Sequence, residues 1–270
     1  MAERITRFAP SPTGPLHLGH AYAALVAQAR GDTLLLRIED IDTARCTAAF
    51  EQGIYDDLHW LGVAWQTPVM RQSDRARAYA AALAHLQALG LTYQCSCTRG
   101  DIRAALSAPQ EGTIGPDGPI YPGTCRDKVQ TGVVRLNMAR AMQRLGRIGF
   151  VETGAAADKP EFNADHMQSL VGDVVLARRD IGTSYHLSVV VDDAAQAITE
   201  VTRGKDLFDA TKIHVVLQRL LGLPTPQYHH HRLIRDDAGK RLAKRDDARA
   251  LSKYRAEGAS SGDIRAMVGL

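Results

Sequence analysis

Short apolar runs alternate with helical patterns in the first part of the chain. Residues 5–9 and 34–38 have the composition of buried strands, and an alanine-rich helix from about 17 to 29 separates them. A second helix is predicted over 43–61. Because parallel strands need a crossover segment between them, this βαβ rhythm predicts an α/β fold with a doubly wound parallel sheet. Its ligand site should lie beyond the carboxyl ends of the strands.

The rhythm is interrupted once and then resumes. A helix over 74–89 is followed by the segment 93–127, which holds three of the four cysteines and a turn-rich stretch at 109–119. Strand-like segments follow at 133–138, 148–152 and 174–178, and the βα rhythm returns with 185–193, 198–203, a helix at 207–221 and the run 228–235. We therefore expect a discontinuous nucleotide-binding catalytic domain (1–93 and 181–250), an inserted smaller α+β subdomain (94–180) and a short C-terminal tail (251–270).

Length and composition narrow the class of protein only a little. The chain has 270 residues, enough to bury a sizeable core, and charged residues interrupt its apolar stretches. We expect neither a membrane span nor a secretory leader, and we place the protein in the cytoplasm. The net charge of +3 permits an anionic partner, but ordinary enzymes are often equally basic. Charge alone therefore does not identify a nucleic-acid-binding protein.

The segment 7–20 carries the strongest indication of function. Its prolines keep it out of a helix, and Gly14 and Gly19 leave room for a ligand near the backbone. The helix that follows begins with N–H groups that attract phosphate. His17 and His20 lie three residues apart at this helix start, so both can face one pocket. Taken alone, the pattern is more typical of an ordinary strand-turn-helix with capping or surface histidines.

The tetrad HLGH at 17–20 resembles the HIGH motif of class I aminoacyl-tRNA synthetases, and the surrounding RFAPSPTGPLHLGHA resembles the glutamyl and glutaminyl branch. This resemblance implies the Rossmann-like class I fold with an inserted subdomain, and ATP with Mg²⁺ as a substrate. It also implies that His17, Gly19 and His20 bind ATP. The two histidines would be catalytic, stabilising the charge that moves onto the α-phosphate.

A second part of the ATP site is expected in the loop 237–246. There a glycine precedes four cations within six residues, a pattern that on its own is typical of a solvated charge run. Its RLAKR resembles the KMSKS loop of the same family, which implies that Lys244 is catalytic and contacts the ATP phosphates. Arg241 stands in place of the first lysine and Ala243 in place of the serine, so the motif is altered at two positions.

The resemblance also supplies an amino-acid pocket for L-glutamate. The residues that match glutamate-binding positions of glutamyl-tRNA synthetase-like proteins are Arg7, Ser11, Glu39, Tyr185 and Arg203. The chemistry is coherent, because glutamate carries two carboxylates and one ammonium. Two guanidinium groups, one carboxylate and a hydroxyl can bind it selectively. Val189 stands where full-length glutamyl synthetases are expected to have asparagine, which indicates a distinct subgroup.

Three cysteines form a candidate metal site. Cys95 and Cys97 make a CxC pair and Cys125 follows in the same insertion, which gives three thiolates where a closed zinc site needs four ligands. Spacing alone leaves open reduced, buried thiols that share a segment. The family resemblance implies Tyr121, in YPGTC, as the fourth ligand of a structural Zn²⁺. Cys46 is given no role.

The expected acceptor rests on the length of the chain together with the family resemblance. Only 24 residues follow Asp246, which leaves no room for an anticodon-binding domain. The chain is therefore similar to truncated relatives of glutamyl-tRNA synthetase that attach glutamate to the queuosine base in the anticodon loop of tRNA(Asp). We expect three binding partners, namely tRNA(Asp) with queuosine, L-glutamate and ATP, and we expect the protein to be a monomer. Unpaired loop bases can be splayed into a pocket, whereas a paired stem cannot.

Two other classes of function stay open from the sequence. One is a stand-alone glutamyl-tRNA synthetase core that charges a tRNA 3′ end, or a nucleotidyltransferase with the same fold. The other is a non-catalytic, tRNA-binding regulator. The intact HLGH tetrad together with Glu39, Arg203 and Lys244 counts against the regulator, because a binding-only protein has no need for all of them.

Overall fold

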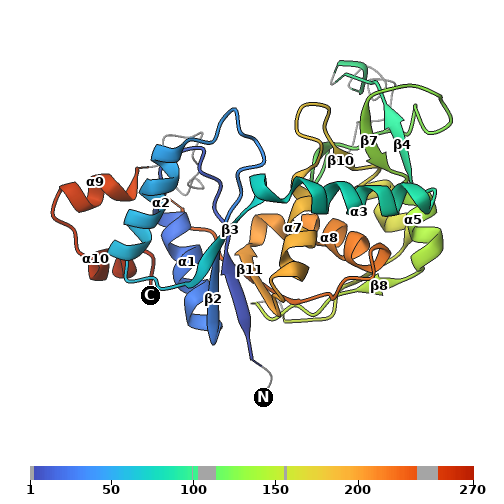
Figure 1. Cartoon of the computed structure of the whole chain (residues 1–270). Helices are drawn as coiled ribbons and strands as arrows, with labels where there is room; N and C mark the ends of the chain where they lie inside the picture. Colours follow the sequence, from blue (N-terminus) through green and yellow to red (C-terminus); the bar gives the residue numbers. More distant parts are fainter. Residues whose placement is uncertain (1–2, 99, 103–113, 155–156, 236–248) are drawn as a thin grey trace.

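The structure is a computed structural model that describes residues 3–98, 100–102, 114–154, 157–235 and 249–270. Its central layer is a parallel sheet in two parts (Figure 1). In the first part β2 lies between β1 and β3, and in the second β11 pairs with β12. The strands are β1 (Ile5–Phe8), β2 (Thr33–Ile38), β3 (Gln66–Arg71), β11 (Glu200–Gly204) and β12 (Gln227–His231).

The two parts of the sheet meet where β1 lies beside β11. The Thr199 N–H donates to the carbonyl of Ile5 over 3.0 Å, which extends the order to β3-β2-β1-β11-β12. After β1 the chain crosses to β2 on one side, and after β11 it crosses to β12 on the other. The connections therefore diverge between β1 and β11, and ligands bind open α/β sheets at such a switch point. The predicted doubly wound parallel sheet is confirmed.

Helices cover both faces of this sheet. On one side α1 (Leu18–Arg30) contacts β1, β2 and β11, and α2 (Ala48–Trp60) shares its apolar cluster. On the other side lie α3 (Ala76–Ala88), α7 (Tyr185–Ala195) and α8 (Phe208–Leu220), to the right of the sheet in Figure 1. Short 3-10 turns precede α3 and α8, at Gln72–Arg75 and Lys205–Leu207. The two helical layers belong to separate apolar clusters of the core.

The inserted segment is built on an antiparallel sheet of β4 (Thr92–Cys95), β7 (Val133–Leu136) and β10 (Val175–Ala177). Two small hairpins accompany it, β5 (Ile114–Gly115) with β6 (Gly118–Pro119) and β8 (Ile148–Gly149) with β9 (Glu161–Phe162). Its helices α5 (Met138–Leu145) and α6 (Ala164–Leu170) share one apolar cluster with α7 and α8. The insertion is therefore fused to the catalytic layer by a common core. The α+β prediction for it is confirmed, while the domain boundaries stay a prediction.

The last twenty residues form two short helices, α9 (Leu251–Ala256) and α10 (Ser261–Met267), at the left of Figure 1. Leu251, Ile264 and Val268 are buried in the same cluster as α1. The segment expected to be a tail thus contributes to the core around the first helix.

Several element boundaries differ from the expectation. The run 185–193 lies within a helix, because the Ser184 side chain caps it and a short apolar run does not distinguish a buried strand from a buried helix. The helix expected from 43 starts at Ala48, where Thr47 is the N-cap. The strand expected over 148–152 is a strand only at Ile148–Gly149, and Glu152 adds isolated β-bridges to Asp158 and Tyr228. Residues 109–113 of the turn-rich stretch lie outside the described residues, and 114–119 form the β5–β6 hairpin.

Candidate active site

The two histidines of HLGH hold the first turn of α1. Nδ1 of His17 accepts a hydrogen bond from the Gly19 N–H at 3.1 Å, and Nδ1 of His20 accepts one from the His17 N–H at 3.2 Å. The ring centroids are 3.8 Å apart. Because each Nδ1 accepts, the neutral form of each ring carries its proton on Nε2, the arrangement that can donate to phosphate oxygens. A Cβ at Gly19 would lie 2.9 Å from the His17 ring, so the glycine makes room for that ring.

This geometry corrects one expectation. Two N–H groups at the start of α1 are already bonded to histidine side chains, so fewer of them are open to phosphate than the sequence suggested. The capping and the phosphate-binding interpretations of His17 and His20 are therefore compatible. Each ring uses Nδ1 for the cap, and phosphate binding would involve Nε2.

A buried ion network lies at the switch point between β1 and β11. Asp193 accepts from the Arg7 Nε at 3.0 Å and from a terminal nitrogen of Arg37 at 2.7 Å, and Arg37 also donates to Glu39 at 3.1 Å. Arg37 is fully buried. Two guanidinium groups thus face two carboxylates, and the network is neutral when all four are ionised.

Burial and charge act in opposite directions within this network. Burial alone would raise the pKa of the Asp193 carboxyl, but Arg7 and Arg37 outweigh it and hold the pKa below its usual range. Burial raises the pKa of Glu39, which Arg37 and Arg7 offset only in part. An ammonium group placed beside Glu39 would therefore favour its ionised form.

Arg203 differs from the other arginines of the site. It is 5% exposed, and its terminal nitrogens donate to Thr211 Oγ1 at 3.2 Å, to His214 Nδ1 at 3.0 Å and to the Tyr185 hydroxyl at 2.9 Å. All three partners are neutral, its Nε has no partner, and no carboxylate of the described residues forms an ion pair with it. A buried cation without a counterion is costly, so this position is suited to an anionic ligand.

A cavity of about 610 Å³ opens beside these groups. Ser11, Glu39 and Tyr185 line it, and its far wall belongs to the insertion, with Asp117 and Arg135. This volume is within the range typical of small-molecule sites. The structure brings together three of the five predicted glutamate residues on its wall. Arg203 reaches them through Tyr185, and Arg7 through the ion network.

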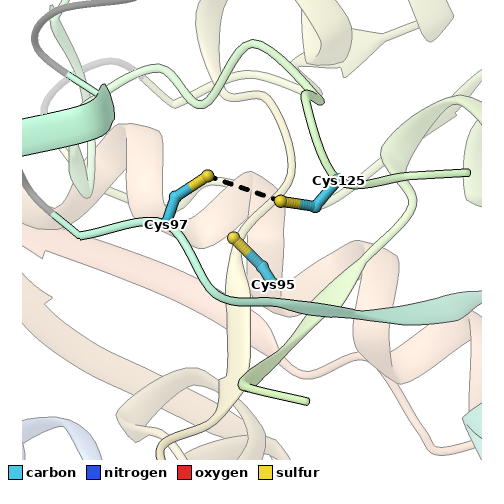
Figure 2. Close-up of side chains that lie close together, drawn as sticks. All are labelled: Cys95, Cys97 and Cys125. Atoms are coloured by element: carbon cyan, nitrogen blue, oxygen red, sulfur yellow. Dashed lines mark hydrogen bonds between the residues drawn. The ribbon is translucent and has the colours of Figure 1, made fainter. Parts of the chain in front are cut away.

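The cysteine cluster lies at the end of β4 (Figure 2). The three Sγ atoms lie within 4.8 Å of one another, with Cys97 and Cys125 3.4 Å apart, and the Tyr121 hydroxyl is 3.5 Å from the Cys97 Sγ. Tetrahedral zinc with Zn–S bonds of about 2.3 Å needs sulfurs about 3.8 Å apart, so this donor set fits the ion. A Cβ at Gly132 would lie 1.9 Å from the Cys95 carbonyl, so only glycine allows this packing.

The surroundings favour the ionised form of one ligand in this cluster, Cys125, whereas they raise the pKa of Cys97 and of Tyr121. Burial raises the pKa of the Cys125 thiol, but the hydrogen bond with the Tyr121 hydroxyl and further polar contacts outweigh it and lower the pKa to about 6. The Arg135 guanidinium lies 4.0 Å from the centroid of the Tyr121 ring, a cation–π contact that holds this ring beside the thiols. With four donors the site would leave no position for water, as expected for a structural metal.

Lys244, with Arg241 and Ala243, lies outside the described residues. The chain beyond that segment is described, and it returns to the HLGH turn. Ala250 forms a β-bridge with His17, and the Leu251 N–H donates to the Leu16 carbonyl at 2.8 Å. The chain that follows the predicted ATP-binding loop therefore lies beside the predicted ATP-binding histidines.

Comparison with known proteins now places the chain in a family. The model of the catalytic domain of class I tRNA synthetases (E and Q) matches residues 4–269, so the chain belongs to this family of ligases. The Glutamyl-Q tRNA(Asp) synthetase of Rhodobacter capsulatus is 61% identical, over 98% of this chain and 100% of that protein. The protein of the same name from Geobacter sulfurreducens is 41% identical, over 93% of this chain and 78% of its own length.

Solved structures agree with this placement. A glutamate tRNA ligase from Elizabethkingia meningosepticum, solved in complex with its amino acid, superposes with a TM-score of 0.78 at 25% identity over 100% of this chain. The chain spans 61% of that protein. Methionyl-tRNA synthetase of Mycobacterium tuberculosis has the same fold, with a TM-score of 0.64 at 12% identity. In the part of the chain described here, no helix is long and apolar enough to cross a membrane.

The sequence analysis missed Arg37 and Asp193, which complete the ion network. Both stand within apolar runs, in LLLRIED and VVVDDAA, and a charge inside a run that must be buried was the available signal. It also missed His186 and His214, which connect Arg203 to the insertion. Nothing in their local sequence marks them, because they meet only through the packing of α7 on α8.

Proposed function

We propose that this protein activates L-glutamate with ATP and transfers the glutamyl group to the queuosine base in the anticodon loop of tRNA(Asp). The observation that carries glutamate recognition is Arg203, a buried guanidinium held by neutral partners and paired with no carboxylate of the described residues. Tyr185 and Ser11 supply hydroxyls, and Glu39 supplies the carboxylate for the ammonium group. Arg7 supports this set through Asp193.

The HLGH turn binds ATP in this proposal. In the proposal His17 and His20 donate from Nε2 to the phosphates of ATP with Mg²⁺, Gly19 allows their arrangement, and Lys244 approaches from the following loop. These groups stabilise the charge that develops as the glutamate carboxylate attacks the α-phosphate and pyrophosphate leaves. Zn²⁺ would be held by Cys95, Cys97, Tyr121 and Cys125, and it would brace the insertion.

The acceptor part of the proposal is supported by the relatives. A protein 61% identical over its whole length is named for queuosine-containing tRNA(Asp). ATP, glutamate and tRNA meet in the cytoplasm, which is where we propose that the protein acts. The bond formed would be an ester to a hydroxyl of the cyclopentene ring of queuosine, labile to mild alkali.

The test has two stages. Glutamate-dependent ATP–pyrophosphate exchange is measured with and without tRNA, and we expect it without tRNA. Labelled glutamate is then offered with tRNA(Asp) that carries queuosine and with the same tRNA that carries guanosine. Transfer to the modified tRNA alone supports the proposal. Label recovered at the 3′ adenosine would identify a glutamyl-tRNA synthetase core, and absence of exchange would favour a non-catalytic protein.

A further inference from the structure

A chain of side chains leads from Arg203 to the insertion. Arg203 contacts His214 Nδ1 at 3.0 Å, His214 Nε2 lies 3.0 Å from His186 Nδ1, and His186 Nε2 lies 3.3 Å from a carboxylate oxygen of Asp117. His214 belongs to α8, His186 to α7 and Asp117 to the turn between β5 and β6. Both histidines are buried, whereas Asp117 is half-exposed and lines the same cavity as Glu39 and Tyr185.

The chemistry of the two ends fixes every proton in this chain. A guanidinium can only donate, so Nδ1 of His214 must accept and the ring carries its proton on Nε2. That proton is donated to Nδ1 of His186, so His186 carries its own proton on Nε2. Asp117, as a carboxylate, accepts that last proton. All bonds therefore run in one direction, from the cation to the anion.

Asp117 is the member of this hydrogen-bond chain that contacts His186 from the insertion. If its carboxylate were absent, the Nε2 proton of His186 would lose its acceptor and the ring would no longer be held in its orientation. Nδ1 of His186 could then move away from the Nε2 proton of His214, and His214 from Arg203. A buried donor that loses its acceptor costs free energy, so Arg203 would shift.

We propose that Asp117 is a positioning residue for the glutamate pocket, acting through His186 and His214 on the guanidinium of Arg203. This inference rests on the function proposed above and extends it, because it assigns a specificity-determining role to the β5–β6 hairpin. The hairpin also carries the chain toward Tyr121 and the cysteine cluster. A contact made by the insertion, from Asp117 to His186, thus supports substrate recognition at the switch point of the sheet.

The charges around Asp117 and His214 favour the protonation states that this series of hydrogen bonds requires. The bond to His186 holds the pKa of the Asp117 carboxyl below its usual range, so that it is an acceptor. Burial, together with Arg203 and His186, lowers the pKa of His214 well below its usual value, so that its ring stays neutral. Arg135, which lines the cavity beside Asp117, also favours the carboxylate form.

The experiment compares three variants of the full-length protein. Asp117→Ala removes the acceptor, and Asp117→Asn keeps an oxygen that can accept from His186. Asp127→Ala makes the same truncation at an exposed acid of the same insertion. We expect Asp117→Ala to raise the KM for glutamate about tenfold in ATP–pyrophosphate exchange, with kcat and the KM for ATP nearly unchanged. Asp117→Asn and Asp127→Ala should stay within about threefold of the unaltered protein.

A second readout does not depend on activity. Imidazole nitrogen NMR of the free protein should show His186 and His214 as single tautomers protonated on Nε2, and Asp117→Ala should shift the ring resonances of His214, which reaches Asp117 only through His186. An unchanged KM together with unchanged His214 resonances in Asp117→Ala would overturn the inference. Absence of glutamate-dependent exchange in the unaltered protein would instead contradict the proposed function. Unequal melting temperatures of Asp117→Ala and Asp117→Asn would indicate a structural role.

Discussion

Arg203 donates a hydrogen bond to the hydroxyl of Tyr185 at 2.9 Å and thereby joins β11 to the first residue of α7. The pair lies at the switch point of the sheet, with the cavity in front of Tyr185 and the Arg203 side chain buried behind it. Folding has already removed Arg203 from water, at a cost in free energy. A ligand carboxylate that binds here would offset that cost by pairing with the guanidinium.

The first prediction concerns Arg203. Arg203→Ala should raise the KM for glutamate by at least about thirtyfold, about 2 kcal/mol, because the ligand carboxylate loses a buried charge partner. Arg203→Lys should retain little of the affinity for glutamate, because an ammonium cannot reproduce the planar set of donors to Thr211, His214 and Tyr185. Arg219→Ala, an exposed arginine on α8, is the control. If the KM for glutamate were the same in these variants and in the unaltered protein, Arg203 would not bind glutamate.

The second prediction separates two roles of His17. His17→Asn should keep the cap of α1, because asparagine is a strong N-cap residue, but it should lower kcat for exchange about a hundredfold by removing the donor to phosphate. His17→Ala should lose the cap as well, with about 1 kcal/mol less stability toward urea. Similar kcat values in His17→Asn and the unaltered protein would mean that His17 serves only as a cap.

The third prediction concerns the pH dependence of glutamate binding. Burial raises the pKa of Glu39. In the free protein this carboxyl therefore stays partly protonated at pH values where an ordinary glutamate is fully ionised. An ammonium group binds the ionised form, so glutamate affinity should rise with pH until Glu39 is fully ionised. Calorimetry from about pH 5 to about pH 8 should show proton release that disappears at the upper end. Glu39→Gln should bind weakly and without this pH dependence.

The fourth prediction concerns the ion network. Asp193→Asn should destabilise the protein by about 3–5 kcal/mol, because Arg7 and Arg37 share that carboxylate in a buried site. The folded pKa of Asp193 is lowered, so its contribution is fully present above the unfolded pKa of about 3.9 and is lost as pH falls through the folded value. The stability gap to the variant should therefore narrow below about pH 4.

Urea unfolding at several pH values measures that gap. Asp180→Asn is the matched control, since Asp180 pairs with Arg178 at the surface, where an ion pair contributes little to stability. A gap for Asp193→Asn that is as small as the control would show that the network is dispensable for stability.

The fifth prediction concerns the metal. Protein purified without chelator should contain one zinc per chain, and Cys125→Ser should lose it because the four donors act together. Cys46→Ser makes the same change outside the cluster and should keep the metal. Zinc removal should lower the melting temperature of the protein and leave the exchange reaction measurable at low temperature. Full zinc occupancy in Cys125→Ser would contradict the site.

The sequence by itself determined the elements that depend on local pattern. Alternation of apolar runs and helices predicted the parallel sheet, and the residues 7–20 marked the turn between β1 and α1. The cysteines also converge as their spacing suggested, because Cys95 and Cys97 are two residues apart at the end of one strand. Such features can be predicted from the sequence because the geometry of a helix or strand repeats every few residues and leaves a local pattern of apolar and polar positions.

Only the tertiary structure decided which charged groups meet. Arg37 and Asp193 are separated by 156 residues, and Asp117 reaches Arg203 through side chains on two helices. These pairings depend on β1 lying beside β11 and on α7 packing against α8. Periodicity within one element carries no information about the side chain that another element brings opposite. A buried charge in the sequence shows that a partner is needed, and the packing of the core selects that partner.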